Sequence, residues 1–318
     1  MIIGHQQQWS FLEKMAGGGR VPQALLFSVA EGLGKRKIAL EFIKLLNCER
    51  PLQTPCGRCF SCLNLENKTN PDFLIIEPQG KEIQIGQIRG LQKFLSYTRQ
   101  LNKFKAALID NAHCLNQEAQ NCLLKTLEEP RGDTILILTT PLPQTLFKTI
   151  LSRCEQLKFY PVEPKEMEKG FEAYKEHPRW QDILIWSDGR PGLAARFFQQ
   201  EESVKQHLSD LALIDSLLKG GLLERLLLIK NYWAGLAGAG KDASDEESDN
   251  SMEVINDFLE TWLFHSRQSL RSEINVGKND GSMKRLAENL KKIENLKFLL
   301  LNSNINKRLL LENLAINL

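Results

Sequence analysis

A short glycine-containing loop near the start of the chain has the chemistry of a phosphate-binding site. Gly32, Gly34 and Lys35 follow the apolar run 24–27 and precede the helical pattern 38–43. A strand, a glycine loop and a helix N-terminus together present backbone N–H groups to an anion, and a lysine adds a point charge. The loop therefore predicts a nucleotide-binding site.

Parts of that site are missing. The complete pattern is G-x-x-x-x-G-K-S/T, but Val29 stands at its first glycine and Arg36 at its Mg²⁺-binding hydroxyl. Asp110 ends a strand-like run where an ATPase holds Mg²⁺, yet the next residue, Asn111, cannot activate water. Thr140 ends another such run and could sense a γ-phosphate, although a hydroxyl there also commonly bonds to local backbone. We expect a degenerate ATP site.

Arg153 is a second candidate for phosphate chemistry. It lies between an apolar helical pattern and the strand-like segment 156–159. A guanidinium presented outward there could reach a neighbouring subunit's nucleotide and stabilise charge on the phosphoryl group. On composition alone, a helix-capping arginine or a surface ion pair is the commoner explanation.

Four cysteines form a compact cluster in the sequence. Cys48, Cys56, Cys59 and Cys62 have the spacing C-x7-C-x2-C-x2-C. Four soft ligands at short spacing suit a closed tetrahedral Zn²⁺ site, which is structural rather than catalytic. Unmetallated thiols and an iron–sulfur cluster are the alternatives. The three remaining cysteines are isolated, and we expect them to be small buried apolar residues.

The elements that position these residues alternate between helix and strand over the first 160 residues. The strand signals are continuous apolar runs, which are typical of strands buried on both faces. They lie at 24–27, 72–78, 105–110 and 134–140. The pattern predicts an α/β fold with a parallel sheet covered by helices, and Asn116 is predicted to cap one of these helices.

Strand signals stop beyond residue 160. Short helices are expected to about 203, and longer helices from there to the end. One small and acidic stretch, 237–250, interrupts the helices. We expect a solvated loop there, and the role of its acidic part, 242–250, is left open.

Bulk composition excludes several classes. The 318 residues suffice for two or three domains, and 42% hydrophobic and 25% charged residues are typical of a soluble globular protein. The net charge of +2 gives no global reason to expect nucleic-acid or membrane binding. No apolar run approaches a membrane span, and the first residues do not form a signal peptide. We expect a reducing, cytoplasmic location, where clustered cysteines more often bind metal.

These motifs together resemble the delta-prime family of subunits in the clamp loader of bacterial DNA polymerase III, which has the AAA+ fold. The resemblance covers most of the chain and is weakest at about 200–280. It is carried by Gly4-His5-Gln6, by 27–37, by the four cysteines, by 108–113, by the Leu-Leu-Lys-Thr-Leu-Glu-Glu-Pro run at 123–130, by Ser152-Arg153-Cys154 and by 306–314.

The resemblance implies three domains. An AAA+ base at 1–160 would carry the zinc module 48–62 as an insertion. A helical lid would occupy 161–203, and a helical collar at 204–318 would hold the subunits in a hetero-pentamer. The implied partners are gamma/tau-type ATPase subunits and a delta-type subunit, with the sliding clamp and primer–template DNA reached through the assembly.

The resemblance also implies a role. Arg153 becomes an arginine finger that acts in trans on a neighbouring ATPase subunit. Besides the three departures at Val29, Arg36 and Asn111, Gly192 stands where active subunits have an arginine in the lid, and Arg190 could replace it only if that loop shifts. We therefore expect a subunit of the DNA-directed DNA polymerase holoenzyme that does not itself hydrolyse ATP and acts as a rigid arm.

Two other functions compete with this one. The first is an ATP-hydrolysing motor subunit of the clamp loader, which Lys35 and Asp110 favour. The second is a zinc module that binds nucleic acid. Arg58 is the single basic residue between Cys56 and Cys62, which is too little charge for a phosphate-binding face.

Overall fold

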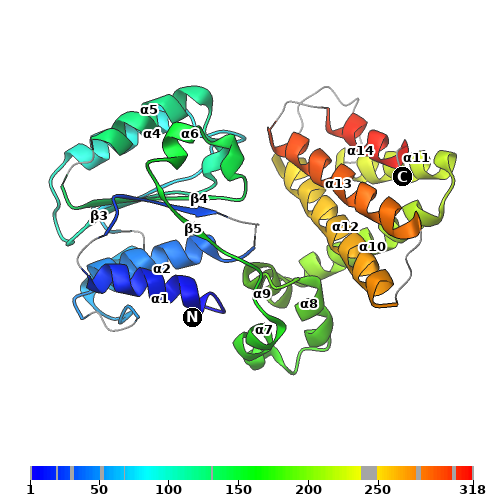
Figure 1. Cartoon of the computed structure of the whole chain (residues 1–318), viewed down its shortest axis with the longest axis horizontal. Helices are drawn as coiled ribbons and strands as arrows, with labels where there is room; N and C mark the ends of the chain where they lie inside the picture. Colours follow the sequence, from blue (N-terminus) through cyan, green and yellow to red (C-terminus); the bar gives the residue numbers. More distant parts are fainter. Residues whose placement is uncertain are drawn as a thin grey trace. The chain divides into compact units, whose positions relative to one another are not determined.

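The computed structural model consists of two compact units, residues 1–198 and 199–318 (Figure 1). It describes residues 2–18, 21–28, 32–50, 54–67, 69–129, 132–237, 249–276, 281–302 and 306–316. The finer division into base, lid and collar stays a prediction. Val29 and most of the acidic stretch 242–250 lie outside the described residues.

The first unit is built on a five-stranded sheet in the order β2-β3-β4-β1-β5, and all of its strand pairs are parallel. The predicted parallel sheet is thereby confirmed. Every residue of β1 and β3 is buried, as the continuous apolar runs require. The strands are β1 (Ala24–Ser28), β2 (Phe73–Ile76), β3 (Lys105–Ile109), β4 (Thr134–Thr140) and β5 (Glu155–Lys158).

Helices cover both faces of this sheet (Figure 1). Successive strand residues point to opposite faces, so Leu26 and Leu25 belong to two different core clusters. The first cluster includes residues of α4 (Ile85–Ser96) and α5 (Gln117–Glu128). The second includes residues of α1 (Gln6–Gly17) and α2 (Lys35–Asn47). The short helices α3 (Phe60–Glu66) and α6 (Lys148–Leu151) complete this part, with 3₁₀ turns at Ala112–Cys114 and Pro143–Thr145.

The predicted cap of α5 is confirmed. The Asn116 side chain accepts a hydrogen bond from the Ala119 amide at 2.9 Å. This satisfies one of the free N–H groups at the start of the helix. The cap fixes where α5 begins, and the helix then runs to Glu128.

Short helices follow the sheet within the same unit. They are α7 (Pro164–Gly170), the 3₁₀ turn Glu172–Tyr174, α8 (Trp180–Trp186) and α9 (Pro191–Gln199). Phe171, Tyr174 and Phe198 pack their rings together, with Tyr174 stacked on Phe198 at 4.7 Å. The Val162 amide donates to the Gly189 carbonyl at 2.7 Å, which ties this helical segment to the end of the sheet.

The second unit is helical throughout its described residues, as the sequence predicts. Ile255, Phe258 and Trp262 are fully buried or nearly so in its core. Its helices are α10 (Glu201–Lys219), α11 (Leu222–Ala237), α12 (Asp249–Val276), α13 (Gly281–Asn302) and α14 (Lys307–Ile316). In the described part of the chain, no helix combines the length and the apolar character needed to cross a membrane.

Candidate functional site

Two glycines of the predicted loop lie just before a helix in the structure. Strand β1 ends at Ser28, and α2 begins at Lys35. Gly32 and Gly34 have φ values of 79° and 82°, a left-handed conformation that side chains with a Cβ rarely adopt. Lys35 is buried at the first position of the helix. A strand, two glycines with positive φ and a helix N-terminus thus follow one another in the described residues, and their phosphate-binding role stays a prediction.

The chain itself packs closely against this loop. The Gly192 amide donates to the Gly32 carbonyl at 2.7 Å, and a Cβ on residue 192 would lie only 2.8 Å from that oxygen. A glycine at 192 is thus what allows the approach. His5, near the N-terminus of the chain, also contacts the loop, with its Nε2 3.0 Å from the Leu33 carbonyl oxygen. Burial, the largest influence, lowers the pKa of His5, and the bond to Leu33 opposes that shift.

Arg190 also lies beside the loop. Its Nε donates to the Ser187 carbonyl at 3.1 Å, and its side chain is buried. A Cβ built on Gly32 would be 3.5 Å from the Arg190 Cβ, so the two residues are close neighbours.

The acidic residue after β3 is held by a cation from its own chain. Arg36 donates to Asp110 Oδ2 at 3.0 Å and also forms an ion pair with Glu77. The Thr139 hydroxyl donates to Asp110 Oδ1, and the Asn111 amide donates to the Thr139 hydroxyl at 3.3 Å. In the sequence, Arg36 stands where a P-loop has its metal-binding hydroxyl. In the structure, its guanidinium pairs with Asp110, the carboxylate expected to hold Mg²⁺.

Sequence reasoning missed Glu77, and at the end of β4 it selected Thr140 rather than the neighbouring Thr139. The parallel register pairs Ile76 with Ile109, so residues 77 and 110 emerge together at one edge of the sheet. That signal was available from the strand predictions. Thr140 is different: it is fully buried, and its hydroxyl accepts a hydrogen bond from the Leu142 amide at 3.0 Å. Its proposed phosphate-sensing role stays a prediction.

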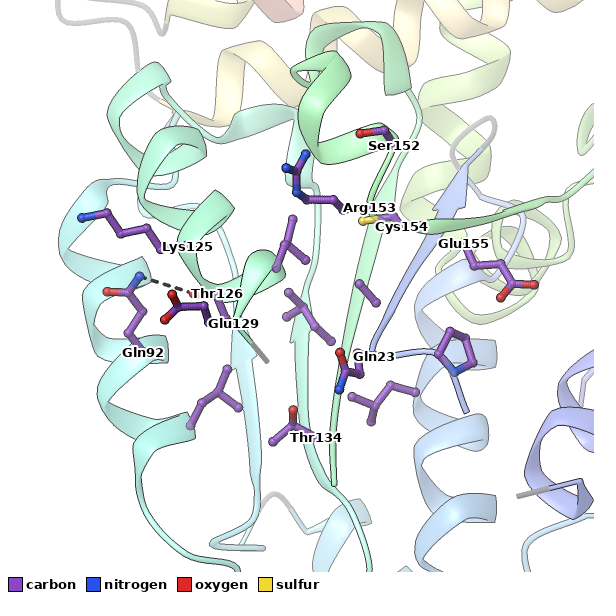
Figure 2. Close-up of a pocket in the computed structure, with 16 residues that line it drawn as sticks. Gln23, Gln92, Lys125, Thr126, Glu129, Thr134, Ser152, Arg153, Cys154 and Glu155 are labelled. Atoms are coloured by element: carbon purple, nitrogen blue, oxygen red, sulfur yellow. Dashed lines mark hydrogen bonds between the residues drawn. The ribbon is translucent and has the colours of Figure 1, made fainter. Parts of the chain in front are cut away.

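Arg153 lies near the amino ends of the strands, just before β5, whereas Asp110 lies beyond their carboxyl ends (Figure 2). Strands β1 and β5 are parallel and pair Leu25 with Glu155 and Ser28 with Lys158. Three residue steps along a strand correspond to roughly 10 Å. Arg153 is therefore separated by at least the length of the strand from the loop that follows Ser28, and its geometry does not favour action on that loop.

The Arg153 side chain is partly exposed and has two contacts. Its Nη2 donates to Glu128 Oε1 at 2.8 Å, and its Nη1 donates to the Thr149 carbonyl at 3.0 Å. Arg153 also borders a cavity of about 630 Å³ between α4, the end of α5 and the amino ends of β1, β4 and β5 (Figure 2). Polar residues in its lining include Gln92, Lys125, Thr126, Glu129 and Ser152.

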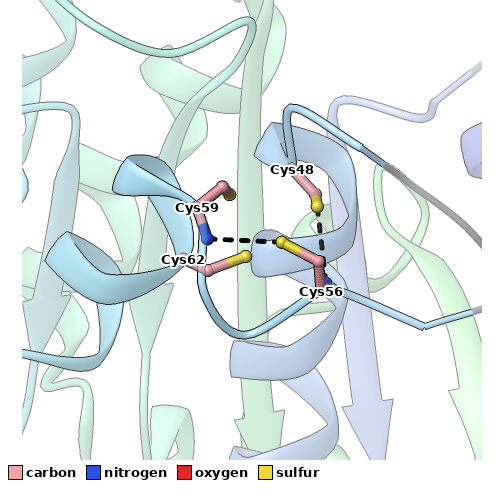
Figure 3. Close-up of side chains that lie close together, drawn as sticks. All are labelled: Cys48, Cys56, Cys59 and Cys62. Atoms are coloured by element: carbon pink, nitrogen blue, oxygen red, sulfur yellow. Dashed lines mark hydrogen bonds between the residues drawn. The ribbon is translucent and has the colours of Figure 1, made fainter.

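The four predicted metal ligands come together in space (Figure 3). Cys48 directly follows α2, Cys59 precedes α3, and Cys62 lies within α3. Their Sγ atoms and that of Cys56 all lie within 4.8 Å of one another. A tetrahedral zinc ion with Zn–S bonds of about 2.3 Å places its sulfurs roughly 3.8 Å apart. The arrangement fits such an ion after small side-chain adjustments.

Hydrogen bonds already favour a thiolate in this cluster. The Cys59 amide donates to Cys56 Sγ at 3.3 Å, and the Cys56 amide donates to Cys48 Sγ at 3.5 Å. The backbone N–H of Arg58, and then that of Cys59, lower the pKa of Cys56 to about 6. Burial has the opposite effect on Cys62 and raises its pKa. Metal binding favours deprotonated thiols, so the N–H···S bonds suit a ligand set.

Of the three cysteines outside this cluster, Cys154 is a buried residue, as predicted. Burial raises the pKa of its thiol to about 12. Cys114 and Cys122 are half-buried. A thiol held neutral in apolar surroundings is unreactive, so Cys154 serves as a packing residue.

Comparison with known proteins identifies relatives of this chain. A family model described as "DNA polymerase III, delta subunit" matches residues 4–163. The chain is 37% identical over 204 residues to the DNA polymerase III subunit delta' of Pseudomonas aeruginosa, an alignment that covers 61% of this chain and 60% of that relative. It is 38% identical over 149 residues to the Bacillus subtilis delta' subunit, covering 47% and 45% of the two chains.

A related subunit type also matches. The DNA polymerase III subunit tau of Escherichia coli is 34% identical over 172 residues, which cover 54% of this chain and 27% of tau. The matched part thus spans three fifths or less of the length of each of these relatives. Because the family model covers half of the sequence, the chain belongs to the DNA polymerase III delta-subunit family.

Proposed function

We propose that this chain is a cytoplasmic clamp-loader subunit that does not hydrolyse ATP itself and supplies Arg153 as an arginine finger to a neighbouring ATPase subunit. Its partners would be gamma/tau-type and delta-type subunits in a hetero-pentamer. The assembly would place a sliding clamp on primer–template DNA, with this chain as a rigid arm. The delta' relatives and the family match support this assignment.

One observation carries the non-hydrolysing half of the proposal. The guanidinium of Arg36 is bound to both Asp110 and Glu77. Hydrolysis of ATP at this loop needs a carboxylate that is available to organise Mg²⁺. A magnesium ion would have to displace a positive group that is part of the chain. Asn111 offers no carboxylate to activate water, and Gly192 lies directly on the loop.

The position of Arg153 supports the second half. A guanidinium stabilises the charge that spreads over a transferred phosphoryl group, and such a contribution amounts to roughly 10³–10⁵ in rate. Arg153 is partly exposed and lies near the amino ends of the strands, away from Lys35, so a phosphate that it contacts would not be one held by this chain's own glycine loop. The Gly32, Gly34, Lys35, Asp110 and Thr140 set would then be a relic of a nucleotide site.

We assign the four cysteines to a structural Zn²⁺ ion. All four positions of a tetrahedral ion would be filled by Cys48, Cys56, Cys59 and Cys62, which leaves no place for a substrate. Metal analysis of the purified chain should find about one zinc per chain, with loss of the metal in Cys59→Ser. A metal-free wild-type chain would contradict the assignment.

A hydrolysing motor subunit is the alternative. The intact loop geometry at Gly32 and Gly34, the position of Lys35 and the match to tau favour it. Isothermal titration of the chain with ATP and Mg²⁺ separates the two functions. We expect weak or undetectable binding that does not depend on Mg²⁺. Tight Mg²⁺-dependent binding would overturn the non-hydrolysing proposal.

A further inference from the structure

The contact between Glu128 and Arg153 joins two different elements. Glu128 is the last residue of α5, and Arg153 follows α6 at the start of β5. The two residues are 25 positions apart in the sequence, and Nη2 and Oε1 approach to 2.8 Å. On the other terminal nitrogen, Nη1 donates to the Thr149 carbonyl. The guanidinium is thus held at two points, by a carboxylate side chain and by a backbone carbonyl.

This contact contributes little to the stability of the fold. The Arg153 and Glu128 side chains are 36% and 49% exposed. Ion pairs at such exposure contribute about 0–1 kcal/mol, because water screens them and ordering two long side chains costs entropy. The main effect of the pair is therefore to orient the Arg153 guanidinium rather than to stabilise the fold.

Orientation is what an arginine finger needs. A free arginine side chain loses about 2 kcal/mol of rotamer entropy when it is fixed in one conformation. Contacts made before the partner docks remove part of that cost from the docking step. Each terminal nitrogen carries a second N–H group, so the contacts to Glu128 and Thr149 still leave donors for a phosphate.

We propose that Glu128 is a positioning residue for Arg153. It fixes the guanidinium at the end of α5 so that the outward N–H groups meet the phosphate of a nucleotide bound to the neighbouring subunit. This inference rests on the proposed function, since it assumes that Arg153 acts in trans. Glu128 does not touch the nucleotide; it acts through Arg153.

The test uses the reconstituted clamp loader containing the full chain, with ATP turnover measured on primed DNA. Glu128→Ala should lower kcat about tenfold and leave KM and assembly unchanged, since misplacing a catalytic group slows the chemical step. Glu128→Gln keeps an oxygen acceptor at the same place and should retain activity within about twofold of wild type. Glu128→Asp keeps the charge but withdraws the carboxylate, and should resemble Glu128→Ala.

A matched control exists in the same unit. Arg99 and Asp133 form an ion pair at 2.8 Å, with side chains 44% and 60% exposed. Asp133→Ala removes a comparable exposed pair that does not involve Arg153, and should leave kcat unchanged. In an Arg153→Ala background, Glu128→Ala should cause no further loss, because the residue that it positions is gone.

The outcomes separate this inference from the proposed function. If Arg153→Ala slows turnover but Glu128→Ala leaves it unchanged or makes it faster, Glu128 does not position the finger. An equal loss in Glu128→Ala and Glu128→Gln would also overturn positioning, since charge alone would then account for the effect. If Arg153→Ala itself has no effect, the finger role fails, and this inference fails with it.

Discussion

Two regions at opposite edges of one sheet differ in how their charged groups are used. Beyond the carboxyl ends of the strands, Asp110 is bound by Arg36 and Thr139, and the loop before Lys35 is covered by Gly192. Near the amino end of β5, Arg153 is tethered but partly exposed. In the first region the Asp110 carboxylate is paired within the chain, whereas in the second the Arg153 side chain stays partly exposed.

Under the proposed function, the first region is a nucleotide site that has lost its activity while its fold persists. Residues of β1, Leu33 and residues of α2 belong to one packed core cluster. Arg36, which stands in the sequence at the position of the metal-binding hydroxyl, forms an ion pair with Asp110.

Asp210, a buried carboxylate in the helical unit, is a useful contrast to Asp110. We expect it to give the largest effect on stability, through the pH dependence of the free energy of unfolding. Asp210 is 1% exposed and accepts a hydrogen bond from the neutral Gln206 amide at 2.8 Å. Burial, with a smaller contribution from Asp257, raises the pKa of Asp210 from 3.8 to about 7. Asp110, by contrast, has a cation beside it.

The folded chain therefore holds the Asp210 proton more tightly than the unfolded chain does. This contribution to stability is complete below about pH 4 and is lost as the pH rises to about 7. Its slope is at most about 1.4 kcal/mol per pH unit. Urea denaturation should show that Asp210→Asn removes this pH dependence. Parallel curves for wild type and variant from pH 4 to 7 would contradict the prediction.

Gly192→Ala tests how tightly the loop is covered. The new Cβ would lie 2.8 Å from the Gly32 carbonyl, so the backbone must shift and the hydrogen bond must lengthen. We expect a loss of about 1–3 kcal/mol in the free energy of unfolding, measured by urea denaturation.

Gly90→Ala is the matched control for that change. Gly90 lies in α4, and a Cβ there meets no atom within 4 Å. Replacing an exposed helical glycine by alanine should stabilise the chain by about 0.5–1 kcal/mol. If Gly192→Ala were as well tolerated as Gly90→Ala, the loop would not be closed by this contact.

Arg36→Thr gives the smallest expected effect. It restores a hydroxyl at the metal position and releases Asp110 and Glu77 from their ion pairs. We expect ATP binding in the presence of Mg²⁺ to tighten by about tenfold, or about 1.4 kcal/mol, relative to wild type in a calorimetric titration. The gain stays small because Gly192 still covers the loop, and Asn111 should keep the variant from hydrolysing ATP. An unchanged affinity would mean that Arg36 is not what blocks the metal.

Local patterns in the sequence were sufficient for the elements and for part of the site. Continuous apolar runs located the buried strands, and Asn116 located the start of α5. Short spacing keeps Cys56, Cys59 and Cys62 close together, whereas the approach of Cys48 depends on how the longer connection from α2 folds. The position of Lys35 at the start of α2 also followed from local sequence.

The contacts that decide function depend on elements distant in the sequence. Arg36 meets Asp110 across 74 positions, and Arg153 meets Glu128 across 25. Their formation depends on the strand order and on the exact end of each helix, which local patterns do not give. Which of Thr139 and Thr140 reaches Asp110 depends on the pleat of β4, since neighbouring residues point to opposite faces.

The direct test of the central claim replaces the two charged residues separately in the reconstituted clamp loader. Lys35→Met removes the charge from the closed loop but keeps an unbranched side chain, and Arg153→Ala removes the proposed finger. We predict that DNA-stimulated ATP turnover stays near the wild-type rate in Lys35→Met and falls by at least about tenfold in Arg153→Ala, with assembly intact in both. Loss of turnover in Lys35→Met, with an unaffected Arg153→Ala, would show that the working site is the loop and would contradict the proposed division of roles.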